Sequence, residues 1–112
     1  MKKLEIIIKP ERLDELKSIL TSCGVNGMMI GNIMGFGNQK GYTRSYRGTK
    51  FTVNLLPKMK VETVVDDETA EIIIKLVSDK MSTGEYGDGK IFVSPVEDVV
   101  RIRTGERGQA AL

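Results

Sequence analysis

The sequence predicts one α+β domain with a ferredoxin-like fold, in which two helices cover one face of an antiparallel sheet. Its 112 residues suit a single domain, since domains usually contain ~100–150 residues. Apolar residues make up 40% and charged residues 29%, an ordinary balance for a globular protein. The periodic segments follow one another as strand, helix, strand, strand, helix, strand, which is the split βαβ order (βαββαβ). We therefore expect one domain that spans residues 1–112.

The first three elements are predicted from apolar spacing and from the residues that end them. In residues 2–9 apolar side chains recur at every second position, which predicts a strand with one buried face. Pro10 ends this strand and opens a helix that stops at Gly24, because proline suits the first helical turn and glycine the residue after the last. Residues 28–34 alternate again and predict the second strand.

The second half of the chain repeats this pattern. Residues 59–65 alternate and predict the third strand. Asp66 and Asp67 are suited to cap a helix that runs to Met81, with apolar residues at helical spacing. The remaining segments are, in order, a short strand at 91–93, an extended piece at 99–103 and a polar tail at about 104–112.

One face of the predicted sheet has no helix to cover it. That face still carries apolar side chains such as Ile7. Small domains with such a face usually bury it by self-association, so we expect an oligomer.

The segment between the second and third strands, about residues 37–55, is the anomaly of the chain. It has neither a helical nor a strand period and is far longer than the usual connection of ~4–6 residues. Residues 35–60 contain six basic residues and no acidic one, while the net charge of the whole chain is only +2. We expect a long basic loop that contacts an anion or an acidic surface rather than nucleic acid. The alternative is a surface loop with no partner.

Several classes of protein are excluded by composition. The chain has no histidine, the commonest general base and zinc ligand, and its one cysteine cannot form a disulfide framework. Cys23 falls on the apolar stripe of the first helix, where a core position is the better interpretation. Charges interrupt the amino-terminal apolar run, which suits neither a signal peptide nor a membrane span. We expect a cytoplasmic protein that is not inserted in a membrane.

Two glycine-rich segments indicate anion binding. Residues 35–41 leave a strand and hold three glycines, although a bulged strand end would explain them equally well. Residues 83–92 hold Gly84, Gly87 and Gly89 just before Lys90, more glycine than a tight turn needs. In the piece predicted to be extended at 99–103, Arg101 and Arg103 would leave one face and hold a polyphosphate. Together they predict a nucleotide site.

These motifs also resemble a known family. Tyr46-Arg47-Gly48 in the long loop, Leu56-Pro57-Lys58, residues 83–92 and Arg101-Ile102-Arg103-Thr104-Gly105-Glu106 are similar to the PII family of nitrogen-regulatory signal transduction proteins. The resemblance spans the whole chain. It implies a homotrimer without enzymatic activity that binds ATP or ADP in clefts between subunits, and 2-oxoglutarate beside Mg-ATP. It also implies that the long loop, called the T-loop, docks onto an ammonium transporter or another nitrogen-metabolism target, which would recruit the protein to the membrane.

The resemblance also assigns residues to each role. Nucleotide contacts would be Met29, Gly35, Phe36, Gly37, Asn38, Gln39, Val64, Gly87, Asp88, Gly89, Lys90, Arg101 and Arg103. Contacts with 2-oxoglutarate would be Gln39, Lys40, Gly41 and Lys58, and Gln39 would help to bind Mg²⁺ with ATP. The partner-binding loop would present Tyr42, Arg44, Tyr46, Arg47, Thr49, Lys50 and Phe51.

Two departures from the family pattern matter, one at the tip of the long loop and one beside the adenine. Many relatives carry a uridylylated tyrosine where this chain has Phe51, whose side chain has no hydroxyl. Thr49 falls where some relatives carry a phosphorylated serine, so phosphorylation is still chemically possible there. Met29 replaces a threonine beside the adenine and can pack on the ring but donates no hydrogen bond.

Other functions remain open at this point. A small nucleotide-hydrolysing enzyme would use the same glycine loops, but the chain has no histidine and no obvious base near them. A PII-like sensor could act outside nitrogen metabolism with altered ligand specificity. An RNA-binding ferredoxin-like module would need aromatic residues in its strands in a pattern that this chain lacks.

Overall fold

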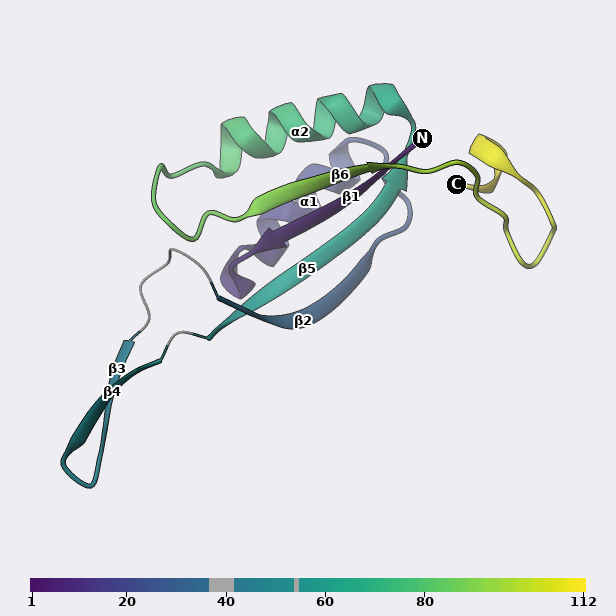
Figure 1. The fold of residues 1–112 in the computed structure, drawn as a ribbon. Helices are drawn as coiled ribbons and strands as arrows, with labels where there is room; N and C mark the ends of the chain where they lie inside the picture. Colours follow the sequence, from purple (N-terminus) through teal and green to yellow (C-terminus); the bar gives the residue numbers. More distant parts are fainter. Residues whose placement is uncertain (37–41, 54) are drawn as a thin grey trace.

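The computed structural model describes residues 1–36, 42–53 and 55–112, with the backbone alone for 42–46 and 49–53. Four strands form an antiparallel sheet in the order β2-β5-β1-β6, and both α-helices lie on one face of it (Figure 1). The strands are β1 (Lys2–Ile8), β2 (Met29–Gly35), β5 (Leu56–Val65) and β6 (Lys90–Pro95). The helices are α1 (Leu13–Ser22) and α2 (Asp67–Met81), with 3₁₀ turns at Pro10–Arg12 and Gly108–Ala111. The predicted ferredoxin-like layout is confirmed.

The core lies between the helices and the sheet. Every second residue of β1 is buried, as the alternation predicts, because these side chains face the helices. The same face of β5 and one stripe of each helix complete the layer. Its buried residues are Leu4, Ile6, Ile8, Leu16, Ile19, Leu20, Val61, Val65, Ala70, Ile73, Val77 and Met81. Cys23 packs against this cluster with a partly buried side chain, which agrees with its predicted core position.

The predicted ends of the helices are also found. Gly24 follows α1 with a φ of +82°, a left-handed conformation that glycine adopts without strain. At the start of α2, the Asp66 carboxylate accepts a hydrogen bond of 2.8 Å from the Thr69 backbone N–H. This bond, together with one from the Thr69 hydroxyl, lowers the pKa of Asp66. The end of α1 and the start of α2 are therefore fixed by local chemistry that the sequence displays, whereas Pro10 opens a 3₁₀ turn and α1 itself begins at Leu13.

The long loop is more regular than expected. Residues 42–53 form a hairpin of β3 (Tyr42–Tyr46) and β4 (Thr49–Val53), a separate two-stranded sheet. Arg47 and Gly48 make its turn with φ values of +50° and +82°, the pattern of a type I′ hairpin turn. The expectation of a segment without regular structure was wrong here. These strands pair with each other and not with the four-stranded sheet, so the apolar alternation of that sheet does not extend to them.

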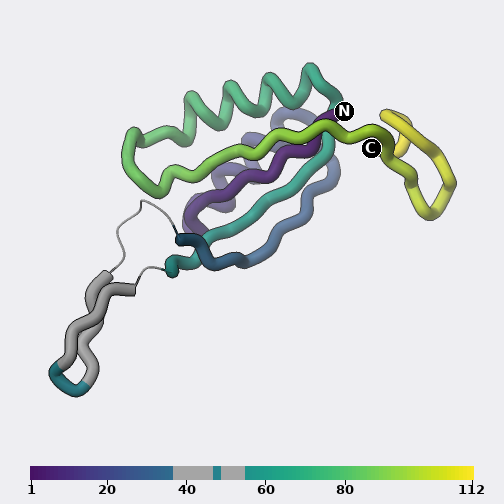
Figure 2. Tube along the Cα trace, viewed as in Figure 1, coloured from purple at the N-terminus to yellow at the C-terminus, as the bar shows by residue number. Residues whose placement is uncertain are grey.

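The prediction of an extended piece at 99–103 is wrong as well. Val100 forms only an isolated bridge with Arg107, and residues 102–104 are a turn. The Gly105 N–H donates to the Arg101 carbonyl at 2.7 Å, which turns the chain back on itself. Gly105 permits this with a φ of +74°. Arg101 and Arg103 therefore lie on a folded C-terminal arm, residues 96–112, and not on one face of a strand (Figure 2).

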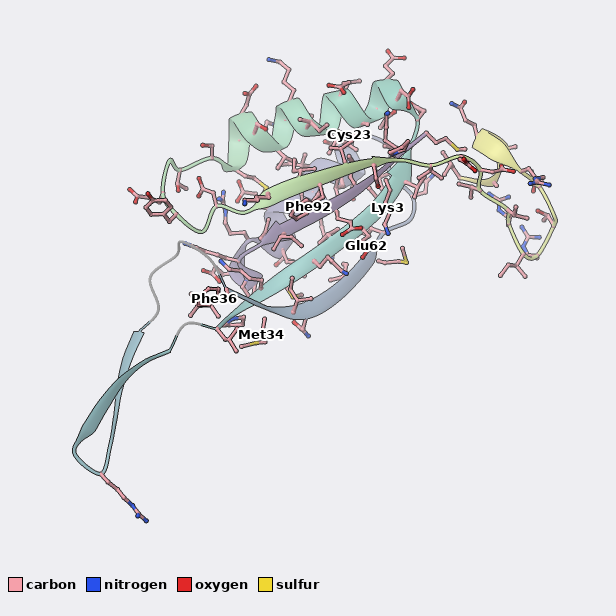
Figure 3. The ribbon with its side chains drawn as sticks, in the orientation of Figure 1. Lys3, Cys23, Met34, Phe36, Glu62 and Phe92 are labelled. Carbon is pink, nitrogen blue, oxygen red and sulfur yellow. The ribbon has the colours of Figure 1, made fainter. Side chains whose placement is uncertain are left out.

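The sheet face opposite the helices is mixed in character. Lys3 contacts Glu5 at 3.3 Å and Glu62 at 3.2 Å, and Lys60 contacts Glu62 at 2.9 Å. The bond to Glu62 raises the pKa of Lys3, and the bonds to Lys60 and Lys3 lower the pKa of Glu62. Phe92 stands beside this ionic cluster and is 54% exposed (Figure 3). The face thus keeps apolar side chains in contact with solvent, as predicted, but around a charged centre.

Candidate functional site

The glycine loop, residues 82–89, joins the end of α2 to the start of β6. Gly84, Gly87 and Gly89 all have left-handed φ values, between +80° and +101°. The Asp88 carboxylate closes the loop by accepting three hydrogen bonds, from the Thr83 hydroxyl at 2.5 Å, the Thr83 N–H at 2.8 Å and the Gly84 N–H at 3.1 Å. These bonds, that of the hydroxyl first, lower the pKa of Asp88. The loop is therefore shaped before any ligand binds.

Gly89 fixes where this loop meets the sheet. A Cβ atom at Gly89 would lie 1.7 Å from the Ile7 carbonyl oxygen, so the two backbones approach as closely as only glycine permits. Lys90 then begins β6 directly opposite Ile7. Lys90 therefore stands at the start of β6, and the backbone of β1 at Ile7 sets the position of that strand end.

Arg12 holds the end of α2, just before this loop, through a contact that the sequence did not indicate. Its guanidinium donates to the carbonyl of Met81, the last residue of α2, and to the Glu15 carboxylate at 3.0 and 3.3 Å. The two residues of the first bond are 69 positions apart in the chain. No local spacing signals such a contact, since it depends on how α1 and α2 pack.

The base of the long loop holds a second cation, Lys58. Its side chain passes under Gly35, where an added Cβ would lie 3.0 Å from the Lys58 Cγ. Lys58 is only 9% exposed, and burial followed by the nearby Lys9 lowers its pKa. Phe36 follows Gly35 and is 74% exposed. A desolvated ammonium at this place favours an anionic neighbour.

One chain does not bring all the predicted nucleotide residues together. Lys90 lies in one row of the sheet with Ile7 and Lys60, whereas Val64 lies in the row of Lys3 and Ser94. Four strand residues separate the two rows, roughly 13 Å. Met29 is 62% exposed on β2 opposite Glu62, between those two rows.

The C-terminal arm carries Arg101 and Arg103 beyond the far end of β6, away from the glycine loop (Figure 2). Arg101 is bound within the arm by the Glu106 carboxylate at 3.0 Å and the Leu112 carbonyl at 3.3 Å. The base of the arm is held by Asp98 and Arg107 at 2.6 Å, and Arg107 lowers the pKa of Asp98. The arm is therefore an ordered unit that presents its arginines far from Lys90 of the same chain.

Some predicted residues lie outside the described part of the chain. These are Gly37, Asn38, Gln39, Lys40 and Gly41. For Tyr42, Arg44, Tyr46, Thr49, Lys50 and Phe51 the described structure is the backbone of the hairpin, and Arg47 stands at its turn. Within residues 1–36, 42–53 and 55–112 no cluster of three acidic or cysteine side chains could hold a metal ion. No helix in these ranges is long and apolar enough to span a membrane.

Comparison with known proteins now decides the family. The family model described as nitrogen regulatory protein P-II matches residues 1–106. The chain belongs to the P-II family. It is 53% identical to the nitrogen regulatory protein P-II of Rhizobium meliloti and 51% identical to those of Nostoc punctiforme and Azospirillum brasilense. Each of these matches covers 100% of both chains. The resemblance inferred from the sequence motifs is therefore confirmed.

The P-II match covers every part of the candidate site. The glycine loop, the ends of the long loop and the first part of the C-terminal arm all fall within residues 1–106. These relatives are named as regulatory proteins of nitrogen metabolism. The assignment to the nitrogen regulatory P-II family therefore extends to all of these segments.

Proposed function

We propose that this P-II protein senses the cell's energy and carbon state by binding ATP or ADP and, with Mg-ATP, 2-oxoglutarate. The observation that carries the proposal is the glycine loop, which is already closed by Asp88 and is followed directly by Lys90 at the start of β6. Backbone N–H groups at positions without side chains can approach phosphate oxygens closely, and an adjacent ammonium adds a charge-assisted contact. The chemistry of this segment therefore fits a nucleotide phosphate chain.

The nucleotide site is proposed to form between two copies of the chain in a homotrimer. Arg101 and Arg103 lie on the arm, at the opposite end of β6 from Lys90 (Figure 2). The arginines and Lys90 of one chain therefore cannot contact the same phosphate chain in this arrangement. A neighbouring copy that supplies the arm would complete a cleft around the glycine loop. The open sheet face supports this assembly, since it holds exposed Phe92 beside charged groups that a second copy can bury.

The 2-oxoglutarate site is proposed at the base of the long loop. Lys58 is a nearly buried cation with a lowered pKa, and a bound carboxylate would offset the desolvation that lowers it. A dianion beside a triphosphate needs a bridging cation, so Mg²⁺ held with Gln39 and ATP is part of the proposed site.

The regulatory output is proposed to pass through the hairpin of the long loop. Its turn presents Arg47, and a planar guanidinium can pair with a carboxylate or enter a narrow pore. An ammonium transporter is the proposed partner, which would recruit a cytoplasmic protein to the membrane; another target of nitrogen metabolism is the alternative. The effector ratio would control docking, because Phe51 has no hydroxyl to modify.

We propose no catalysis at this site. A general base should have a pKa near the working pH, whereas the hydrogen bonds within the glycine loop lower the pKa of Asp88. Asp88 is thus a poor candidate for activating water.

Calorimetric titration of ATP into single variants tests the nucleotide site. Lys90→Ala, Arg101→Ala and Arg103→Ala should each weaken ATP about ten-fold or more, since a charge-assisted contact contributes roughly 1.5–3 kcal/mol. Lys75→Ala is the matched control, because Lys75 is 80% exposed on α2 and contacts only Asp79 among the described ion pairs. Unchanged affinity in all three site variants would place nucleotide binding elsewhere.

A further inference from the structure

We propose that Arg12 and Asp88 are positioning residues that hold the glycine loop in its phosphate-binding shape, without contacting the nucleotide themselves. The inference rests on the proposed nucleotide site and adds two residues with a defined role in it. The set Arg12, Thr83 and Asp88 is called the loop brace below.

The first step is the direction of the Asp88 carboxylate. Both of its oxygens accept hydrogen bonds from the start of its own loop, from Thr83 and Gly84. A carboxylate that faced a phosphate would repel it. Here the two carboxylate oxygens instead accept hydrogen bonds from the N–H and hydroxyl of Thr83 and from the N–H of Gly84, five and four residues earlier. Asp88 therefore ties the end of the loop to its beginning.

The second step is the anchoring of the loop to the body of the protein. Arg12 donates to the Met81 carbonyl, which is one of the last acceptors of α2 and has no intrahelical partner. Glu15 holds the same guanidinium at 3.0 Å, and the Arg12 side chain is only 19% exposed. The end of α2, from which the loop departs, is thus fixed to the start of α1. The positive charge of Arg12 also contributes to the lowered pKa of Asp88.

The third step is that packing alone does not support the loop. A cavity of about 470 Å³ borders it, lined by Met81, Ser82, Asp88, Gly89 and Lys90 among others. The loop therefore has open space on one side, and its shape depends on its two ends. One end is fixed by Arg12 at Met81 and the other by Gly89 against Ile7, while Asp88 joins them.

The direction of the effect separates this role from a simple electrostatic one. If Asp88 faced the phosphates, Asp88→Asn would remove a repulsion and tighten ATP more than ADP. If Asp88 braces the loop, the same change weakens both nucleotides by a similar factor, because the amide has one acceptor oxygen in place of two. Arg12→Met should act in the same direction, and Arg12→Lys should restore part of the affinity through its own donor.

The test is calorimetry of ATP and ADP with wild type, Arg12→Met, Arg12→Lys and Asp88→Asn, together with hydrogen exchange at the backbone N–H groups of residues 82–90. Lys75→Met is the control for losing a basic side chain, and circular dichroism selects a temperature at which every variant is folded. We expect about a five- to ten-fold loss for both nucleotides and faster exchange in 82–90 alone. Tighter ATP binding by Asp88→Asn, or unchanged exchange in both Arg12→Met and Asp88→Asn, would overturn the proposal.

Lys90→Ala separates this failure from that of the proposed function. If Lys90→Ala weakens nucleotide binding while the brace variants do not, the nucleotide site stands and the brace is wrong. If no variant of the loop, including Lys90→Ala, changes binding, the nucleotide does not bind at this loop and the proposed nucleotide site fails together with the brace.

Discussion

Gly89 is the residue whose backbone constrains the candidate site most directly. Its φ of +101° and its contact with the Ile7 carbonyl are both incompatible with a side chain. The two constraints act on one residue at the junction of the loop and β6. The glycines of residues 83–92 are thus needed for a left-handed backbone conformation and a close approach to β1, as well as to leave room for a ligand.

Gly89→Ala should therefore be strongly destabilising. The added Cβ would stand 1.7 Å from a backbone oxygen, so β1 or the loop must shift, and the left-handed φ adds about 1–2 kcal/mol. Gly84→Ala is the matched control, since it shares a positive φ of +80° but has nothing within 4 Å of the new Cβ. Urea unfolding measures both. A loss for Gly89→Ala no larger than for Gly84→Ala would contradict the close approach.

Residues differ in how far their roles could be predicted. Asp66 was predicted as a cap because capping involves neighbours along the chain, and the Thr69 N–H confirms it. The roles of Arg12 and Glu106 were not predicted, since the first depends on helix packing and the second on an unexpected turn. The inward direction of Asp88 was also missed, because spacing alone does not show which way a loop carboxylate points.

At the scale of elements, the start of α2 gives a pH-dependent prediction. The folded pKa of Asp66 lies below its ordinary value of 3.8, so its capping contribution is fully present above that pH. It is lost as the pH falls through the lower folded value. Asp66→Asn retains a capping side chain but does not titrate, so the stability difference between wild type and variant should shrink below about pH 4. Thermal unfolding between pH 2 and 6 tests this, and a constant difference would contradict it.

Elements were predicted best where a buried face imposes a period. The strands β1 and β5 alternate against the helices, and both were found close to the predicted bounds. The hairpin at 42–53 and the arm turn at 102–104 lie outside the four-stranded sheet, so the apolar spacing of that sheet could not reveal them. Both are set by glycines in left-handed conformations, Gly48 and Gly105.

At the scale of the whole molecule, the separation of the predicted nucleotide residues is the main result. Lys90 and the arginines of the arm lie at opposite ends of β6 (Figure 1). The sequence could predict these residues as a set through the family resemblance. Their separation along β6 depends on tertiary structure, which no local pattern encodes.

Light scattering should therefore give a mass of about three times 12.4 kDa at micromolar concentration. The reason is that the proposed cleft needs the arm of a second copy, and the open face bearing Phe92 needs cover. A monomer mass under these conditions would contradict the shared site. Arg101→Ala should leave the mass unchanged if its role is in nucleotide binding alone.

A titration of 2-oxoglutarate tests most directly whether this protein binds nucleotide and 2-oxoglutarate together, as we propose. Calorimetry would compare protein with Mg-ATP, with ADP and without nucleotide, and Gln39→Ala would serve as the variant that loses the cation contact but keeps ADP binding. The account predicts 2-oxoglutarate binding with Mg-ATP only, because the bridging cation offsets the repulsion between the two anions. Tight binding to nucleotide-free protein, or no binding under any of the three conditions, would contradict it.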